Sequence, residues 1–270
     1  MTRRLIVNAD DLGLSPGTNQ GILEAHLNGI LTSTTVMINM PAAEAGIRLV
    51  QQEAPKLGLG LHLNVTTGKP VLPPERVLSL VDSSGEFPYN SKEPLSYLDG
   101  LNANEVRAEI HAQFDRFVQI AGRKPDHLDA HHHSLYHFPA GLSVLLELAR
   151  EHDLPIRAAC DWLTNTDYTG PRYDTLRQMM ADSPAPLWPD CFETRFYDEG
   201  VTAENLRNLL INLPEGVTEL MCHPAHNDNI RQNYAAQREA ELALLTDPSL
   251  PPLLQEQGIE LITFGDLKRA

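Results

Sequence analysis

Short apolar runs alternate with longer amphipathic stretches along the whole chain. The apolar runs are rich in branched residues and predict strands, whereas the stretches between them have helical periodicity. Regular alternation of strand and helix predicts an α/β fold with a parallel sheet, either a (β/α) barrel or a doubly wound sheet. We expect strands at residues 5–7, 34–40, 57–63, 126–130, 156–160, 191–197, 217–222 and 259–264.

Capping residues mark the ends of two expected helices. Ser15 and Pro16 are typical of the N-cap and the first helical position. Asn102, followed three residues later by Glu105, resembles a capping box, and Gly122 is typical of a helix end. These signals predict helices over 16–28 and 103–121. Further helices are expected over 41–50, 140–151, 203–213 and 234–245.

The segment from 64 to 100 interrupts the alternation. It contains five prolines and the turn signal Ser83-Ser84-Gly85. Loops of this length are usually functional or interfacial. We therefore predict one domain over residues 1–270, with a loop excursion at about 64–100.

Composition narrows the function classes. The chain has 21 basic and 36 acidic residues and a formal charge of −15, which argues against nucleic-acid or anionic-membrane partners. No apolar run approaches the roughly 18 residues of a membrane span, and none near the N-terminus matches a signal peptide, so we expect a cytoplasmic protein. The three cysteines are far apart and predict no disulfide framework.

Polar residues recur at the carboxyl ends of the expected strands, which favours the barrel because barrel active sites assemble there. Asp10 and Asp11 follow the first strand, where one carboxylate can bind a metal while the other remains a base; a turn or helix cap is the alternative. His62 lies on the strand face opposite Leu61 and is a candidate ligand, although it could be a hydrogen-bonded core residue.

Residues 127–133 (HLDAHHH) are the strongest local signal for metal chemistry. In an extended strand His127, Asp129 and His131 alternate onto one face, and Asp129 could orient a liganding imidazole. The alternative is a surface histidine cluster. His223, which precedes Pro224, ends a later strand in the same way, and on its own it could be a loop residue without a role.

One carboxylate and two imidazoles, from Asp11, His62 and His131, form a candidate facial ligand set. Such a set leaves positions open for water and substrate, as a metal hydrolase needs. Non-haem iron oxygenases use the same ligand types, so the set alone leaves the reaction open.

Six motifs occur in order over nearly the whole chain: NADDLGLS at 8–15, GILTSTT at 29–35, GLH at 60–62, GKP at 68–70, GRKPDHLDAHHH at 122–133 and MCHP at 221–224. Together they resemble the YdjC-like carbohydrate deacetylases, and most closely the branch that acts on chitooligosaccharides.

The resemblance implies a distorted (β/α) barrel related to the polysaccharide deacetylases and to glycoside hydrolase-type barrels. It also implies a divalent metal, Mg²⁺ or Zn²⁺, which would be held by Asp11, His62 and His131. Asp10 then matches the catalytic base and His223 the general acid in the family's pattern. The substrate would be an acetylated amino sugar, and the protein a cytoplasmic homodimer.

One segment departs from the family pattern. The family usually reads His-His-His-x-His-x-x-Pro, whereas here the fourth histidine is displaced by one position to His137. His226 marks a second place where relatives differ. These departures concern the shape of the sugar pocket and leave His131 in place.

The sequence thus predicts a metal-dependent hydrolase that removes the N-acetyl group of an amino sugar and releases acetate. Three alternatives stay open: a metal hydrolase of another amide or ester, a sugar-binding homologue without turnover, and an iron oxygenase. Asp and His ligands suit zinc, manganese or iron, while magnesium usually prefers oxygen ligands.

Overall fold

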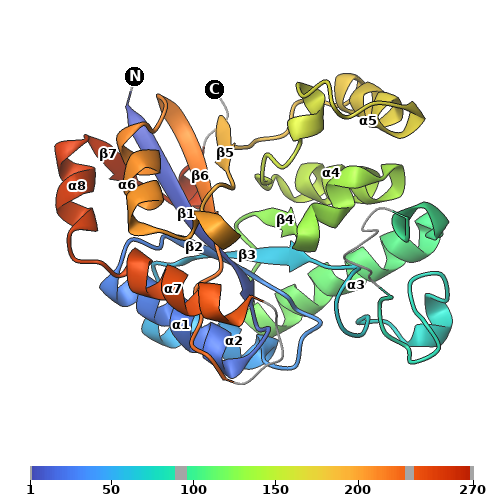
Figure 1. The fold of residues 1–270 in the computed structure, drawn as a ribbon. Helices are drawn as coiled ribbons and strands as arrows, with labels where there is room; N and C mark the ends of the chain where they lie inside the picture. Colours follow the sequence, from blue (N-terminus) through green and yellow to red (C-terminus); the bar gives the residue numbers. More distant parts are fainter. Residues whose placement is uncertain (1, 89–95, 229–233, 268–270) are drawn as a thin grey trace. The chain divides into compact units, whose positions relative to one another are not determined.

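The computed structural model describes residues 2–88, 96–228 and 234–267 (Figure 1). Contacts within the chain divide it into two compact units. Unit 1 comprises Met1–Val36, Pro41–Gly60 and Trp188–Ala270, and unit 2 comprises Met37–Met40 and Leu61–Leu187. The expected single domain over 1–270 stays a prediction.

Unit 1 is built on a parallel sheet whose central strand is β1. Residues Leu5 to Leu12 of this strand are buried. β6 pairs with β1 from Arg3↔Gly216 to Ala9↔Cys222, while β2 and β7 also pair with β1 in parallel. The strand order in this unit is β3-β2-β1-β6-β5. The strands are β1 (Arg3–Leu12), β2 (Ser33–Val36), β3 (Gly58–Leu63), β5 (Cys191–Glu193), β6 (Gly216–Cys222) and β7 (Ile259–Leu261).

Helices connect these strands, as the alternating pattern predicted. Ser15 is the N-cap of α1, and its Oγ accepts a hydrogen bond from the Thr18 N–H at 3.0 Å. In Figure 1, α1 lies beside α2 and α7, which it contacts. The helices of unit 1 are α1 (Pro16–Asn28), α2 (Ala43–Glu53), α6 (Ala203–Ile211), α7 (Ala235–Leu245) and α8 (Leu250–Glu256).

Unit 2 contains the end of β3, paired in parallel with β4 (Leu128–Ala130) so that His62 lies opposite Asp129. Its helices are α3 (Ala103–Ala121), α4 (Pro139–His152) and α5 (Pro171–Asp182), and α4 contacts the other two. The predicted α/β class with parallel strands is confirmed. In the part of the chain that the structure describes, no helix is both long and apolar enough to span a bilayer.

The ends of α3 are those expected from its caps. Asn102 Oδ1 accepts hydrogen bonds from the N–H groups of Asn104 and Glu105, and Gly122 adopts the left-handed conformation with φ 69°. The capping box is not closed, because the Glu105 carboxylate accepts a hydrogen bond from Ser79 instead. Asn102 alone therefore caps the helix, and the Glu105 carboxylate binds the loop through the Ser79 N–H.

The loop that follows β3 is tied to one face of α3. Residues 89–95, which include Pro94 of the expected excursion, lie outside the described residues. Burial raises the pKa of Glu109, and the hydrogen bonds that its carboxylate accepts act in the opposite direction. Three side chains on consecutive turns accept loop N–H groups: Glu105 from Ser79 at 2.7 Å, Glu109 from Val71 and Leu72 at 2.7 and 2.9 Å, and Gln113 from Asn64 at 2.9 Å.

Some predicted elements are wrong or shorter. Residues 156–160 form only one bridge, Ile156 to Leu128, because the chain turns into a 3₁₀ helix at Asp161–Leu163. β2 ends at Val36 because residues 37–40 form a turn, with the Met40 N–H bonded to the Met37 carbonyl at 3.0 Å. α5 and α8 were not predicted.

Candidate active site

Chemically active side chains follow the carboxyl ends of strands in both units. Unit 1 contributes Asp10 and Asp11 from β1 and His223 from the end of β6. Unit 2 contributes His62 from β3 and His131, which follows β4.

An irregularity in β1 separates the roles of its two carboxylates. The register of β1 against β2 shifts between Ala9 and Leu12, and Asp11 has a left-handed backbone with φ 72°. Asp is one of the few residues with a side chain that enters this region at modest cost. Because of this bulge, Asp10 and Asp11 contact different partners.

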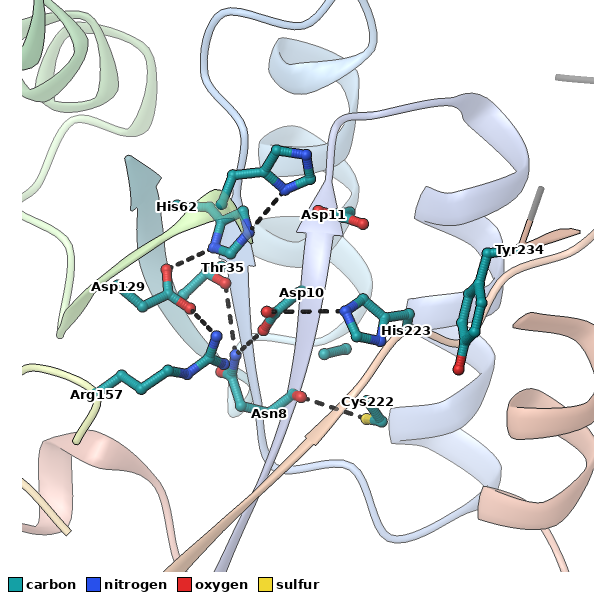
Figure 2. A network of polar contacts seen from close by, with 12 residues as sticks. Asn8, Asp10, Asp11, Thr35, His62, Asp129, Arg157, Cys222, His223 and Tyr234 are labelled. Carbon is teal, nitrogen blue, oxygen red and sulfur yellow. Dashed lines mark hydrogen bonds and ion pairs between the residues drawn. The ribbon is translucent and has the colours of Figure 1, made fainter. Parts of the chain in front are cut away.

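Asp10 faces the histidine at the end of β6. Its Oδ1 accepts a hydrogen bond from Asn8 Nδ2 at 2.9 Å, and its Oδ2 lies 4.0 Å from His223 Nε2 (Figure 2). Asn8 also approaches Thr35 Oγ1 at 3.4 Å. Both Asn8 and Asp10 are buried, so the carboxylate is held in place toward His223.

Asp11 is paired with a cation from α7. Arg238 Nη2 donates to Asp11 Oδ2 at 2.5 Å, and Arg238 Nη1 lies 3.4 Å from the His223 carbonyl oxygen. Both side chains are almost fully buried. The guanidinium therefore fixes Asp11 and the backbone of His223 together.

His223 lies between two carboxylates of unit 1. Its backbone N–H donates to Glu241 Oε2, and its ring Nδ1 lies 3.8 Å from Glu241 Oε1. Glu241 is fully buried and also accepts a hydrogen bond from the Tyr234 hydroxyl at 2.5 Å. Burial, reinforced by the Glu241 charge, raises the pKa of Tyr234, so this hydroxyl remains a donor. The imidazole thus has Asp10 on one nitrogen and Glu241 near the other.

His62 in unit 2 is oriented by a buried carboxylate. Asp129 Oδ1 lies 2.6 Å from His62 Nδ1, and Asp129 Oδ2 lies 3.1 Å from Arg157 Nη1. None of these three side chains is more than 1% exposed. Since a carboxylate accepts the hydrogen bond, Nδ1 of His62 is the donor, and in the neutral imidazole Nε2 is then the nitrogen with the lone pair. This is the orienting role expected for Asp129.

His131 reaches His62 by a route that the extended pattern did not predict. β4 ends at Ala130, and residues His131–His137 form a 3₁₀ segment in which His132 and His133 have left-handed φ values of 54° and 51°. His131 therefore does not continue the strand face of Asp129, and His127 pairs instead with Asp126 at 2.5 Å. The turn places His131 Nδ1 3.2 Å from His62 Nε2.

The spacing of these two nitrogens tests whether the residues fit a metal. Two imidazole nitrogens bound to one ion at about 2.1 Å are about 3.0 Å apart at a right angle and about 3.4 Å apart at the tetrahedral angle. The observed 3.2 Å lies between these values. The His62–His131 pair therefore fits a divalent metal.

His137 and His226, at which the sequence departs from the family pattern, contact other side chains. Burial lowers the pKa of His137, whose ring contacts the Tyr173 ring edge-on with 6.3 Å between centroids. His226 is half exposed and pairs with Glu24 at 2.8 Å. Among the described residues of unit 2, no contact of His137 with the His62–His131 pair is present.

Sequence reasoning missed the supporting residues Arg157, Arg238 and Glu241. Arg238 and Glu241 lie three positions apart on α7, so they share one face of the helix. Charged residues at this spacing are common on exposed helix faces, and nothing local distinguishes a buried pair. Asn8 lies inside the motif at 8–15, but no role was predicted for it.

A family model described as "YdjC-like protein" matches residues 4–256. A carbohydrate deacetylase from Geobacillus stearothermophilus is 39% identical over 270 residues, covering 98% of each chain. A chitooligosaccharide deacetylase from Proteus mirabilis is 35% identical, covering 99% of this chain and 100% of the relative.

Solved structures show the same fold. A protein from Enterococcus faecalis, named for cellobiose-phosphate cleavage, has a TM-score of 0.84 and 35% identity, with 98% of both chains covered. A family 4 carbohydrate esterase from Streptomyces lividans has a TM-score of 0.51 and 11% identity, covering 99% of this chain and 97% of the other. The second likeness carries the fold alone and confirms the predicted barrel-like α/β fold.

Proposed function

Since the chain belongs to the YdjC-like protein family, we propose that it is a metal-dependent hydrolase that removes the N-acetyl group from acetylated amino sugars. The products are acetate and the free amino sugar. The observation that carries this proposal is the His62–His131 pair, whose facing nitrogens fit a metal, in a chain similar to carbohydrate and chitooligosaccharide deacetylases. The substrate class we propose is a chitooligosaccharide-like sugar.

Asp11, His62 and His131 would hold the metal, with one carboxylate oxygen and two imidazole nitrogens as the donor set. A bound divalent metal supplies Lewis-acid polarisation of the amide carbonyl and lowers the pKa of a water molecule. Of the two metals that the family resemblance implies, the two imidazoles favour Zn²⁺ over Mg²⁺, which prefers oxygen ligands. Arg238 would hold Asp11, and Asp129 would hold His62, in the orientations that ligation needs.

Asp10 is proposed as the base that takes a proton from the attacking water. Its carboxylate is anchored by Asn8 on Oδ1, which leaves Oδ2 toward His223. His223 is proposed as the acid that gives a proton to the departing amine, because an amine is a poor leaving group as an anion. The 4.0 Å between their side chains lets both act on one small group. Glu241 keeps the His223 backbone and ring in place.

The localisation and assembly are proposals from the family resemblance: a cytoplasmic homodimer. Light scattering of the purified protein tests the dimer. A hydrolase of another amide or ester remains the second candidate, since the same carboxylate and histidine would serve it.

Two measurements on protein purified without a histidine tag test the function. Metal analysis should find one divalent ion per chain, and N,N′-diacetylchitobiose should release acetate. His131→Ala should lose both, whereas His226→Ala, which changes an exposed histidine, should keep both. Full metal occupancy in His131→Ala would contradict the ligand assignment.

The rival functions give different results. Sugar binding without acetate release after metal reconstitution would show a non-catalytic homologue. Acetate released from a different acetylated amide or ester, with none from amino sugars, would show another hydrolase. Activity that consumes oxygen and stops under anaerobic conditions would show an oxygenase.

A further inference from the structure

An exposed tyrosine lies beside His223. Tyr197 follows β5 and is 46% exposed. It is the only aromatic among the large apolar side chains that are exposed in the described residues. The other four are aliphatic: Leu27, Leu78, Ile211 and Leu261. A single exposed ring is common on protein surfaces, so its place beside His223 carries the argument and not its exposure alone.

The Tyr197 ring is held rigidly from one side. It stacks on Tyr234 with 4.4 Å between ring centroids and 12° between planes. Tyr234 is in turn fixed by its hydroxyl, which donates to Glu241 and accepts a hydrogen bond from the Asp198 N–H at 3.0 Å. Tyr234 therefore covers one face of the Tyr197 ring, and the solvent-exposed surface of Tyr197 lies on the rest of its side chain.

The same two rings flank the imidazole of His223. The centroid of Tyr197 lies 5.5 Å from that of His223, and the centroid of Tyr234 lies 5.7 Å away, both in edge-on geometry. Figure 2 shows Tyr234 on the side of His223 away from Asp10. Tyr197 is therefore in contact with the imidazole that we propose as the proton donor.

We propose that Tyr197 is a stacking platform for the pyranose ring that carries the reacting acetamido group. The inference rests on the proposed function and extends it to a residue that fixes the sugar. The leaving nitrogen is bonded directly to a ring carbon, so a sugar whose nitrogen meets His223 has its ring next to Tyr197. The C–H face of a pyranose is apolar and flat, and it gains by covering an exposed aromatic ring.

This role separates binding from chemistry. Tyr197 touches the sugar ring equally before and during reaction, so its loss should raise KM while kcat changes little. Tyr197→Leu removes the ring and keeps an apolar side chain, and should raise KM for acetylated sugars about tenfold, which is about 1.4 kcal/mol. Tyr197→Phe and Tyr197→Trp keep the ring and should stay within about twofold of the wild type.

The experiment compares these variants on N-acetylglucosamine and N,N′-diacetylchitobiose, with acetate release as the readout. Leu27→Ala, which truncates an exposed apolar residue on α1, is the matched control. Calorimetry of the disaccharide with metal-loaded protein carrying Asp10→Asn, with and without Tyr197→Leu, measures binding without turnover. We expect weaker binding by about the same tenfold factor.

Three results would overturn the platform. A fall in kcat at constant KM would mean that Tyr197 acts only through Tyr234, Glu241 and His223. Sugar binding that is unchanged by Tyr197→Leu would show that Tyr197 does not contact the sugar ring. An effect confined to the disaccharide would place the ring beside a neighbouring sugar unit. Absence of acetate from wild-type protein would instead refute the proposed function, and calorimetry would still decide whether Tyr197 binds sugar.

Discussion

The buried ion pair behind His62 offers a test that needs no metal and no substrate. Arg157 Nη1 lies 3.1 Å from Asp129 Oδ2, and both side chains are fully buried. Arg157→Met keeps a long apolar side chain and removes the charge. The Asp129 carboxylate then loses this cation in a buried site, while its contact with His62 Nδ1 is kept.

The expected cost follows from this burial. Removing one partner of a buried pair leaves an uncompensated charge and costs about 3–5 kcal/mol. For a chain of this size, about 2–4 °C of melting temperature is lost per kcal/mol, which gives a drop of about 6–20 °C. Adding Asp129→Asn removes the stranded charge and keeps an acceptor for His62 Nδ1, so the double variant should recover at least half of the loss.

Urea unfolding of metal-free protein is the assay, because a bound metal would mask the change by stabilising the folded state. Arg107→Met is the matched control, since Arg107 pairs with Glu147 between α3 and α4 on the surface. It should shift the midpoint little, because exposed pairs contribute little to stability. The reasoning is refuted if Arg157→Met stays within about 1 kcal/mol of wild type, or if the two substitutions are simply additive.

Three further outcomes are expected. Asp10→Asn should keep the metal while turnover falls by roughly 10²–10⁴-fold, and loss of metal would show that Asp10 shares in ligation. His223→Ala should lower kcat more for an N-acetyl amide than for an activated acetate ester, whose leaving group needs no proton; equal losses would exclude proton donation. Because burial raises the pKa of Glu109, its contribution to stability is present at low pH and is lost as pH rises through the folded-state value. Glu109→Gln, which stays neutral, should therefore gain stability relative to wild type as pH rises above 4.5, and urea midpoints that differ by a constant amount would contradict this.

Features that depend on neighbouring residues could be predicted from the sequence. The N-caps Ser15 and Asn102 and the left-handed Gly122 were identified because caps are set within one helical turn. An orienting role for Asp129 toward a liganding imidazole was also predicted, and the parallel register of β3 and β4 shows that this imidazole is that of His62.

Features that depend on contacts between residues far apart in the sequence could not be predicted. Arg238 reaches Asp11 across 227 positions, and Arg157 meets Asp129 only because the chain passes β4 again after α4. The strand expected at 156–160 has the right composition, but it pairs at one residue and then turns. The bulge at Asp11 was not predicted either. Strand periodicity predicts side chains that alternate between the two faces of β1, whereas the left-handed backbone of Asp11 breaks this alternation.

The hydrogen-bond acceptors that follow one another along α3 couple the unfolding of the proline-rich loop to that of the helix. The loop N–H groups of Val71, Leu72 and Ser79 end on Glu109 and Glu105, so their protons are protected by a helix distant in sequence. Such amides exchange with solvent only when the loop leaves α3, and that opening takes two backbone donors from the Glu109 side chain, which keeps only the hydrogen bond from Gln113 Nε2 among those described. A segment with the composition of a flexible connection thus shares its opening free energy with the helix that holds it.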